Sequence, residues 1–412
     1  MTLSAQFTPC SFSQARQQLQ TALQCITATE IVTVGTALER FCAENIHAPV
    51  NVPAFDNAAM DGYAFRAQDL NNHDELTLVG TALAGHAFEA PLKPGQALRI
   101  TTGAPMPAGC DSVLPLEQAV LENSTTLNMR QIPIHAGQHR RCCGEDLTIG
   151  TTAIEKGRRL GPAELGLLAA LGMSEILVQK RLRVAIFSTG DELNVAGHEL
   201  GSGQIYDSNR ITLHAMLTRL GAEITDLGVL SDDPETLTET LRLSAPQVDV
   251  ILTSGGVSAG AADFTRQAFQ RLGDMHFLAI QMRPGKPLAF GRIPHLTGNT
   301  YVFGLPGNPV AMMMSFIFLV RPALQLLAGA QFTPVPLIQA KATEAIYKKT
   351  GRTEFQRGNY DFQQCQVTPT DKQGSAMLTS MVQANCILVL PDEQTNIVPG
   401  DTISVVLMQG FV

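Results

Sequence analysis

Three short glycine-bearing segments carry the strongest chemical signal in the sequence. They read Ser-Thr-Gly-Asp-Glu at 188–192, Thr-Ser-Gly-Gly-Val-Ser at 253–258 and Leu-Pro-Gly-Asn-Pro at 305–309, and each follows a run of apolar residues. Small residues let backbone N–H groups approach an anion near the first turn of a helix. Gly255 and Gly256 taken alone could simply turn the chain, but three such turns favour a phosphate-bearing ligand. None has the spacing of a nucleotide P-loop or of the Rossmann fingerprint.

Acidic side chains recur beside these turns. Glu192 lies in the first turn, Asp232 and Asp233 follow a short apolar run, and Asp263 comes after the second turn. Carboxylates repel a phosphate unless a hard cation such as Mg²⁺ lies between them, so the pattern predicts a metal-phosphate site. The alternative for Asp232 or Asp263 is that it caps a helix, and no single residue decides between the two.

Basic residues are fewer and more localised. Arg283 and Lys286 lie three residues apart in Arg-Pro-Gly-Lys-Pro, where proline already restricts the backbone. An oxyanion is the natural ligand of such a pair. Arg352 could add a bidentate fork and Ser375 a hydroxyl, although an isolated arginine is more often a solvated surface charge.

Composition limits the function classes that need weighing. The chain has 412 residues, with 29 Lys plus Arg against 37 Asp plus Glu, no Trp and five Tyr. A nucleic-acid-binding protein is usually more basic and richer in stacking side chains, so we expect no nucleic-acid partner. The sequence lacks HExxH and GxSxG motifs, and no cysteine has an evident histidine partner, which disfavours a metalloprotease or a covalent hydrolase.

The eight cysteines show no CxxC pair and no repeating spacing, which predicts reduced thiols. His135, His139, Cys142 and Cys143 form the one cluster that could offer zinc its nitrogen and sulfur ligands. Adjacent cysteines rarely reach one tetrahedral ion, and two arginines lie inside the cluster. We therefore favour an ordinary loop there.

Hydrophobic periodicity predicts the elements that position these residues. Residues 11–47 have helical apolar spacing, and residues 160–177 have it again, with Pro162 suited to a first turn. Short alternating runs between residues 50 and 140 predict a small β-rich domain, and the tail after residue 331 alternates in the same way.

After residue 180 the pattern becomes strand, glycine-bearing loop and helix, repeated. Near-continuous apolar strands of this kind predict a parallel sheet covered by helices on both faces, which binds ligands at the carboxyl ends of its strands. The expected strands cover 183–187, 248–252 and 301–303, and the expected helices cover 208–220 and 262–272.

The sequence indicates no membrane span and no export signal. The longest apolar stretch, Val310 to Val320, is well short of the ~20 residues that cross a bilayer. The first residues contain neither an early basic residue nor an apolar core, so nothing there directs export. We expect a cytoplasmic protein with no membrane partner.

Six motifs resemble, in order, those of the molybdopterin molybdenumtransferase family, to which the E domain of gephyrin belongs. The likeness covers nearly the whole chain and rests on Pro53–Ala64, Thr101–Pro107, Gly144–Asp146, Ser188–Leu193, Thr253–Ser258 and Leu305–Pro309. It implies an elongated homodimer with four domains per subunit and an active cleft between the subunits. Family members take adenylylated molybdopterin and molybdate, insert molybdenum and release AMP in a Mg²⁺-dependent step. Other proteins of molybdenum cofactor biosynthesis are the implied partners.

Pattern and resemblance together divide the chain into a multidomain α/β plus β fold. The expected parts are a discontinuous helical linker domain at 1–50 and 140–180, a small β-rich domain at 51–139, a doubly wound α/β molybdopterin-binding domain at 181–330, and a C-terminal β-barrel-like domain at 331–412.

The resemblance also assigns roles to individual residues. The catalytic set comprises Asp61, Asp146, Glu192 and Asp263, with Glu192 and Asp263 on Mg²⁺. The substrate-binding set comprises Thr102, Arg141, Asp232, Ser254, Gly255, Gly256, Arg283, Lys286, Pro306, Arg352 and Ser375.

The sequence departs from the family pattern at two positions, and it does not decide which acid positions the attacking water. Arg283 stands where Lys is common, and Ala311 where Ser is frequent. The acid that positions the attacking water stays open, with Asp61 or Asp146 preferred because a metal-held carboxylate is a poor base.

Two other functions compete with the transferase. One is the adenylyltransferase that prepares the substrate, whose single domain resembles residues 181–330. The other is a gephyrin-like scaffold without turnover, which the acids at 61, 146, 192 and 263 disfavour because ionised groups are costly to retain without a use.

Overall fold

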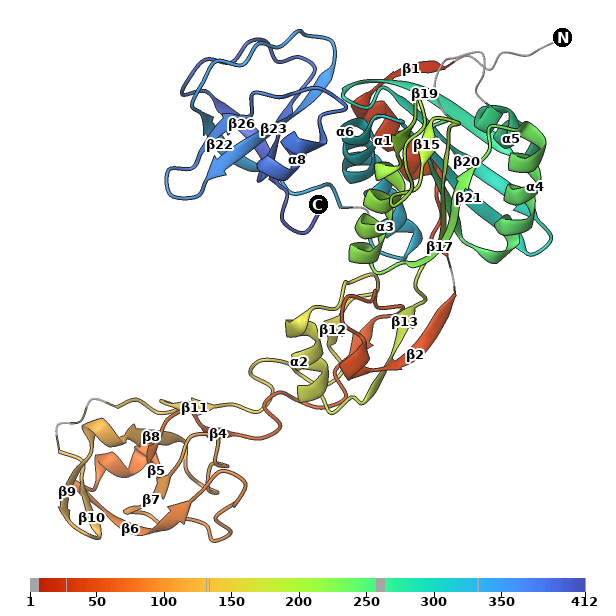
Figure 1. Ribbon diagram of the computed structural model, residues 1–412. Helices are drawn as coiled ribbons and strands as arrows, with labels where there is room; N and C mark the ends of the chain where they lie inside the picture. Colours follow the sequence, from red (N-terminus) through yellow and green to blue (C-terminus); the bar gives the residue numbers. More distant parts are fainter. Residues whose placement is uncertain are drawn as a thin grey trace.

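The protein has an extended, bent shape in which separate domains follow one another (Figure 1). The computed structural model describes residues 7–26, 28–130, 132, 134–256, 264–331 and 333–411. The small β-rich domain lies at one end of the molecule, and the α/β and C-terminal domains lie together at the other. A slender middle domain joins the two ends.

A twisted mixed sheet forms the centre of the α/β domain. Strands β17, β14, β18 and β21 are parallel neighbours, whereas β20 runs antiparallel between β21 and β19, and β1 lies parallel to β19. The predicted parallel sheet is thus confirmed for the three expected strands, and it is extended by β17 on one side and by an antiparallel edge on the other, neither of which the pattern foretold. The strands are β1 (Thr8–Ser11), β14 (Arg183–Thr189), β17 (Glu223–Leu230), β18 (Val250–Ser254), β19 (Asp274–Arg283), β20 (Pro287–His295) and β21 (Gly298–Leu305).

Helices cover both faces of this sheet, as its apolar strands require. On β14, Val184 and Ile186 pack into one core cluster, while Ala185 and Phe187 pack into another on the opposite face. The first cluster receives α1 (Phe12–Ala22), α3 (Ser208–Leu220), α6 (Pro309–Ser315) and α7 (Arg321–Leu327); the second receives α4 (Pro234–Ser244) and α5 (Phe264–Leu272).

The segment from α6 to α7 is one continuous helical stretch with a π-helical turn, Phe316–Val320, at its centre. Its 19 residues have a mean hydropathy of 1.8, which by length and composition would suffice to cross a membrane. However, 83% of the apolar window is buried inside the protein. A core helix of a folded domain has these properties.

The C-terminal domain is a small closed barrel. Its strands pair in the order β23-β24-β22-β26-β25, and a further pairing of β25 with β23 closes the ring. Its elements are β22 (Ile338–Ala342), β23 (Thr353–Asp361), β24 (Gln366–Pro369), α8 (Leu378–Gln383), β25 (Cys386–Leu390) and β26 (Thr402–Leu407). The end of β19 pairs with the start of β23, Met282 with Thr353 and Arg283 with Glu354, so the two domains share one hydrogen-bonded sheet.

The small β-rich domain is a six-stranded sheet in the order β8-β5-β7-β6-β10-β9. Its strands are β5 (Gly62–Phe65), β6 (Glu75–Ala82), β7 (Gln96–Ile100), β8 (Ser112–Pro115), β9 (Val120–Asn123) and β10 (Thr126–Asn128). The short pair β4 (Asn57–Ala58) and β11 (Arg140–Arg141) lies where the chain enters and leaves this domain. Residues 140 and 141, where the predicted linker domain resumes, thus pair with a strand of the predicted β-rich domain.

The middle domain differs from the predicted helical linker. Among the described residues of 11–47 the one α-helix is Phe12–Ala22, and β1 with α1 packs onto the α/β domain because Ala15 and Leu19 complete its core. The middle domain itself contains, besides a short 3-10 turn at Val34–Thr36, one α-helix and two strand pairs. These are α2 (Pro162–Ala170), β2 (Thr29–Thr33) with β13 (Glu175–Gln179), and β3 (Ile46–His47) with β12 (Thr152–Ile154).

Candidate functional site

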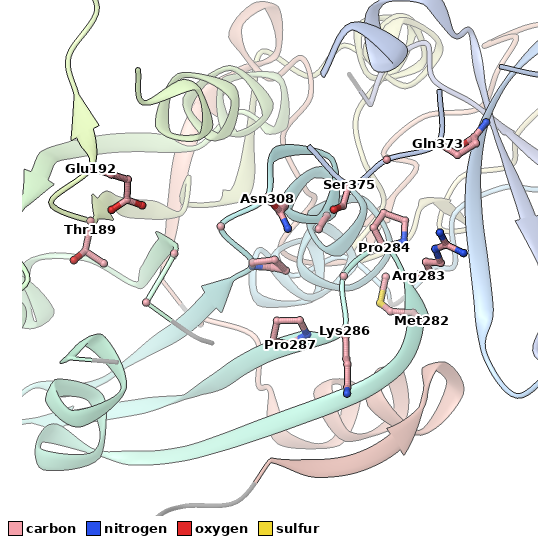
Figure 2. A pocket seen from close by; sticks show the side chains of 18 of the residues that line it. Thr189, Glu192, Met282, Arg283, Pro284, Lys286, Pro287, Asn308, Gln373 and Ser375 are labelled. Atoms are coloured by element: carbon pink, nitrogen blue, oxygen red, sulfur yellow. The ribbon is translucent and has the colours of Figure 1, made fainter. Parts of the chain in front are cut away.

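A cleft of about 810 Å³ lies where the strand ends of the α/β domain meet the C-terminal barrel (Figure 2). Glu192 and Thr189 lie at one end of the cleft, and Arg283 lies at the other. Nine of the predicted site residues line this cleft: Glu192, Asp232, Gly255, Gly256, Arg283, Lys286, Pro306, Arg352 and Ser375. The predicted glycine turns, acids and cations therefore converge on one cavity.

The glycine turns approach one another because β14, β18 and β21 end at the same level of the sheet. Ser188 pairs with Ser254, which pairs with Leu305, and the Gly255 N–H donates to the Leu305 carbonyl at 3.1 Å. Gly256 has φ of +64°, and a Cβ placed there would collide with the Thr265 hydroxyl. Only glycine fits this turn without strain.

Asn209 at the start of α3 ties two of these turns together. Its buried amide nitrogen donates to the Ser254 hydroxyl at 2.7 Å and to the Gly307 carbonyl at 2.6 Å. Ser254 is thus a buried support behind the cleft and does not line it. Asn209 was not among the predicted site residues, and its one signal in the sequence is its place two residues after Asp207, which caps α3.

The acidic side of the cleft consists of Glu192 and Asp232 among the described residues. The Thr189 hydroxyl at the end of β14 donates to the Asp232 carboxylate, which fixes that side chain beside the turn. The neighbouring Asp233 caps α4 by accepting from the Thr236 N–H at 2.7 Å. The capping role that sequence left open for Asp232 therefore belongs to Asp233. Asp263 lies outside the described residues.

The cationic side begins at the turn between β19 and β20. Arg283 and Lys286 are both exposed at the cleft, and Gly285 between them has φ of +108°. A Cβ on Gly285 would lie 2.7 Å from the buried Ser315 hydroxyl of α6, so a side chain would push the turn off this helix. The glycine lets the turn lie directly on α6.

Arg352 reaches the cleft from the C-terminal domain. Its Nε donates at 2.9 Å to the carboxylate of Glu354, which is only 3% exposed. Glu354 is the residue of β23 that lies opposite Arg283 of β19. Within the described residues, no other partner occupies the two Nη groups of Arg352. The buried carboxylate orients the guanidinium through its Nε and leaves its fork directed to the predicted anion site.

Ser375 completes this side of the cleft. Its carbonyl accepts from the Val310 N–H in the first turn of α6 at 3.0 Å, which joins the C-terminal loop to the α/β domain. Figure 2 shows Ser375 beside Asn308, the residue before that helix. Asn308 and Gln373 also line the cleft, and the sequence analysis did not foretell either of them.

The other four predicted residues lie in the small β-rich domain or just after it. Asp61, Thr102, Arg141 and Asp146 are all described and exposed, and none of them lines the cleft. They share one end of that domain, since the β4–β11 pair places Arg141 opposite Asn57 while Gly103 donates to the Ala58 carbonyl.

Asp61 and Thr102 form a tight local pair. One carboxylate oxygen of Asp61 accepts from the Thr102 N–H at 2.6 Å and from its hydroxyl at 2.8 Å. These donors, the backbone N–H first, lower the pKa of Asp61 below its ordinary value. Asp61 therefore stays ionised at neutral pH.

The cysteine cluster behaves as the favoured loop. Cys142 and Cys143 are exposed and free, and the Asn51 amide donates to the Cys143 sulfur at 3.2 Å. Across the ranges that the structure describes, no group of three or more His, Cys, Asp or Glu side chains could hold a metal ion. The zinc alternative has no geometric support.

Comparison with known protein families covers almost the whole chain. The MoeA N-terminal region (domain I and II) matches residues 10–172, the probable molybdopterin binding domain matches 185–326, and the MoeA C-terminal region (domain IV) matches 339–408. All three regions occur in the order that the six motifs predict.

Individual relatives support the same grouping. The chain is 39% identical over 399 residues to the molybdopterin molybdenumtransferase of Haemophilus influenzae, covering 96% of this chain and 98% of that protein. It is 32% identical to gephyrin of Dictyostelium discoideum, covering 92% of this chain and 59% of gephyrin. The crystal structure of the molybdopterin biosynthesis moeA protein from Pyrococcus horikoshii OT3 superposes with a TM-score of 0.84 at 27% identity, covering 97% of this chain and all of that one.

These matches define a multidomain enzyme class built around a molybdopterin-binding domain. The chain belongs to the molybdopterin molybdenumtransferase (MoeA) family.

Proposed function

We propose that the protein is a transferase of molybdenum cofactor biosynthesis that inserts molybdenum from molybdate into adenylylated molybdopterin and releases AMP. One observation carries the proposal: a single cleft places carboxylates at one end and three cationic side chains at the other, at the strand ends of the domain that matches the molybdopterin-binding family. A phosphate-bearing pterin and a tetrahedral oxyanion are substrates that such a cleft can hold together.

The cationic end would bind molybdate. Arg283, Lys286 and Arg352 come from both domains, and their charges complement a dianion. The Ser375 loop lies beside them and can supply a hydroxyl hydrogen bond. Ala311 lines the same cleft and has no hydroxyl, so Ser375 is the described alcohol available to the oxyanion there.

The acidic end would hold Mg²⁺. Glu192 and Asp232 are oxygen donors of the kind Mg²⁺ prefers, and both line the cleft beside glycine turns that can approach a phosphate. Bound there, the ion would neutralise the phosphate charge that builds up as AMP leaves. Thr189 keeps Asp232 oriented toward the turn, because its hydroxyl donates to that carboxylate. Asp263 remains a proposed third ligand on the basis of resemblance alone.

The chain's own residues orient the substrates so that the reacting groups meet. The Gly256 turn lies where the nucleotide phosphate would approach, with the Gly255 N–H already bonded to the Leu305 carbonyl, while the fork of Arg352 faces the oxyanion from the opposite domain. This arrangement lowers the entropic cost of bringing two substrates together.

We further propose that the enzyme works as a cytoplasmic homodimer. Asp61, Thr102, Arg141 and Asp146 lie on the small domain, away from the cleft of the same chain. A second copy could bring them to that cleft, which would explain why residues matching the family motifs lie at both ends of one subunit. Proteins that supply the adenylylated pterin or accept the finished cofactor are the proposed partners.

The first experiment measures AMP release from adenylylated molybdopterin with Mg²⁺ present and molybdate added or withheld. The proposal expects molybdate-stimulated AMP release together with a molybdenum-bearing pterin product. Tight binding of the pterin nucleotide without release under any oxyanion contradicts it and favours a scaffold. Formation of adenylylated molybdopterin from ATP and molybdopterin would instead favour the adenylyltransferase.

A further inference from the structure

Arg357 of β23 is the largest of the fully buried side chains, at 0% exposure. Its guanidinium lies behind the loop that carries Ser375 to the cleft. The Nε donates to the Ser380 hydroxyl at 3.0 Å, and one Nη donates to the carbonyls of Lys372 at 2.9 Å and Gly374 at 3.1 Å. Three of its N–H bonds thus go to the loop and the helix beside it.

No carboxylate neutralises this buried charge. Among the described residues none lies within ion-pair distance of Arg357, and its second Nη is buried without a hydrogen-bond partner. Burial, with Arg283 as the further cause, lowers the pKa of Arg357 to about 10, so the group is still protonated at neutral pH. Buried charges in proteins are normally paired, which makes an unpaired one beside a cationic cleft notable.

The buried Arg40 shows the usual arrangement in the same protein. Its guanidinium, in a side chain 7% exposed, donates to the Glu30 carboxylate at 2.5 Å and to the Gln179 carbonyl at 2.6 Å. Arg40 therefore anchors backbone and is neutralised, whereas Arg357 anchors backbone and is not. The difference leaves a positive charge without a carboxylate partner behind the cleft.

Backbone bonds at the same residue fasten the loop further. The Arg357 N–H donates to the Gln373 side-chain oxygen at 2.9 Å, and the Gln373 amide donates back to the Arg357 carbonyl at 2.8 Å. The next residues are Gly374, held by the guanidinium, and Ser375, whose carbonyl binds the first turn of α6. The position of Ser375 in the cleft thus depends on Arg357.

We propose that Arg357 is a positioning residue for oxyanion binding. It holds the Ser375 loop against the cleft and leaves an unneutralised positive charge beside Arg283, so that a tetrahedral dianion supplies the missing negative charge. This inference rests on the proposed function, because it names a residue that tunes the same site without touching the substrate.

The test compares the full-length protein with Arg357→Gln and Arg357→Lys, and with Arg40→Gln as the control. Equilibrium dialysis measures the binding of molybdate, and hydrogen exchange measures the peptide covering residues 370–376. Arg357→Gln should weaken molybdate binding about tenfold or more, as expected for loss of a charge-assisted contribution. Arg357→Lys keeps the charge but lacks the planar fork, so it should speed exchange in the loop with a smaller loss of binding.

Arg40→Gln should leave both measurements unchanged even if it lowers the melting temperature. Equal losses in Arg357→Gln and Arg40→Gln would overturn the proposal, since a general loss of stability would then explain both. Wild-type molybdate affinity in a folded Arg357→Gln variant would overturn it as well.

Ser380→Ala keeps the test decisive if Arg357→Gln does not fold. It removes only the acceptor of the Nε bond, and we expect faster exchange at 370–376 with about two- to threefold weaker molybdate binding. Unchanged exchange and unchanged binding would overturn the proposal. AMP release is scored separately: wild-type protein that binds molybdate but releases no AMP contradicts the proposed function and leaves the Arg357 comparison intact.

Discussion

The two ends of the molecule carry the residues of one predicted site in different ways. At the cleft, segments from 189 to 375 converge because the sheet of the α/β domain continues into the C-terminal barrel through the β19–β23 pair. At the far end, the Asp61 carboxylate is bonded to Thr102 of the same domain, and Arg141 and Asp146 are exposed. The cleft is built to hold charged ligands, whereas Asp61, Thr102, Arg141 and Asp146, here called the far group, lie on an open surface.

Under the proposed homodimer, this difference means that one copy of the chain assembles only part of the proposed site. The cleft has its own acids, cations and glycine turns and can bind substrates alone. In this proposal, the far group takes part in catalysis when another copy brings it to a cleft. Cleft variants should therefore lose activity in their own copy, whereas far-group variants should lose it in the partner copy. Coexpression of one variant of each kind tests whether the site is shared between two copies.

Glu192→Gln should have the largest effect, about a 100-fold loss of Mg²⁺-dependent AMP release. The substitution keeps the size of the side chain and removes the charge that would hold the ion, and metal stabilisation of a leaving phosphate amounts to several kcal/mol. The measurement is AMP release as Mg²⁺ is titrated. Glu199→Gln, an exposed acid farther along the same loop, is the matched control and should retain wild-type activity. Full activity in Glu192→Gln would remove this residue from the metal site.

Mixing variants from the two ends should restore activity. Asp61→Ala and Lys286→Ala are each expected to be nearly inactive, one at the far group and one at the cleft. Coexpressed with different tags, half of the dimers are mixed and each has one intact combination, so about a quarter of wild-type activity should return in the whole mixture and about half in the purified mixed dimer. AMP release by the purified mixed dimer provides the measurement.

Failure to recover activity in a mixed dimer would place the complete site within one chain. Coexpression of Asp61→Ala with Asp146→Ala is the matched control. Both changes then lie in the far group, so no mixed dimer contains an intact combination and no recovery is expected.

Alanine substitution at one glycine of each end should lower the free energy of unfolding by different amounts. Gly256 at the cleft and Gly103 beside Thr102 both have positive φ, but a Cβ at Gly256 collides with Thr265 whereas a Cβ at Gly103 meets open space. Gly256→Ala should lower the free energy of unfolding by about 2–3 kcal/mol, and Gly103→Ala by about 1 kcal/mol. Urea unfolding of each variant tests this. Equal losses would mean that backbone strain alone, and not packing at the cleft, restricts Gly256.

The sequence predicted those strands, helices and turns that are determined by residues close together in the chain. The continuous apolar strand at 183–187, the helix at 208–220 and the first-turn Pro162 all appear where expected, since burial on both faces and fixed φ act within a few residues. The glycine turns were recognisable for the same reason. The cleft acids and cations could be named because they lie in or beside those turns.

Contacts between distant segments could not be predicted in this way. The segment 29–33 is a strand because it pairs with 175–179, about 140 residues later, and no feature near residue 30 encodes that partner. Likewise Arg283 and Arg352 meet through the β19–β23 pair, and Asn209 bridges two turns by tertiary packing. Arg357 carried no signal at all, because an arginine in an alternating strand is ordinarily assigned to solvent.

Thr102→Val gives the smallest expected effect and tests whether the far group is organised without the cleft. The Thr102 hydroxyl and N–H lower the pKa of Asp61, and the substitution removes the hydroxyl while the backbone bond remains. The pKa of Asp61 should therefore rise toward its ordinary value without reaching it. Carboxyl-carbon NMR titration measures the change, with Asp233 as an internal control because the Thr236 side chain and N–H hold its pKa down independently.

The sign of the accompanying stability change follows from that lowered pKa. A carboxyl whose pKa is lower in the folded state stabilises the fold at pH values above its unfolded-state pKa, near 3.8. This contribution is lost as the pH falls through the folded-state pKa. Wild type and Thr102→Val should thus differ in stability at neutral pH and converge in strong acid. A difference that persists unchanged into acid would mean that the hydroxyl acts through packing and that Asp61 is not held as an anion by its own domain. Asp61 would then need the cleft of a second copy to hold it as an anion, so the far group would depend on the cleft.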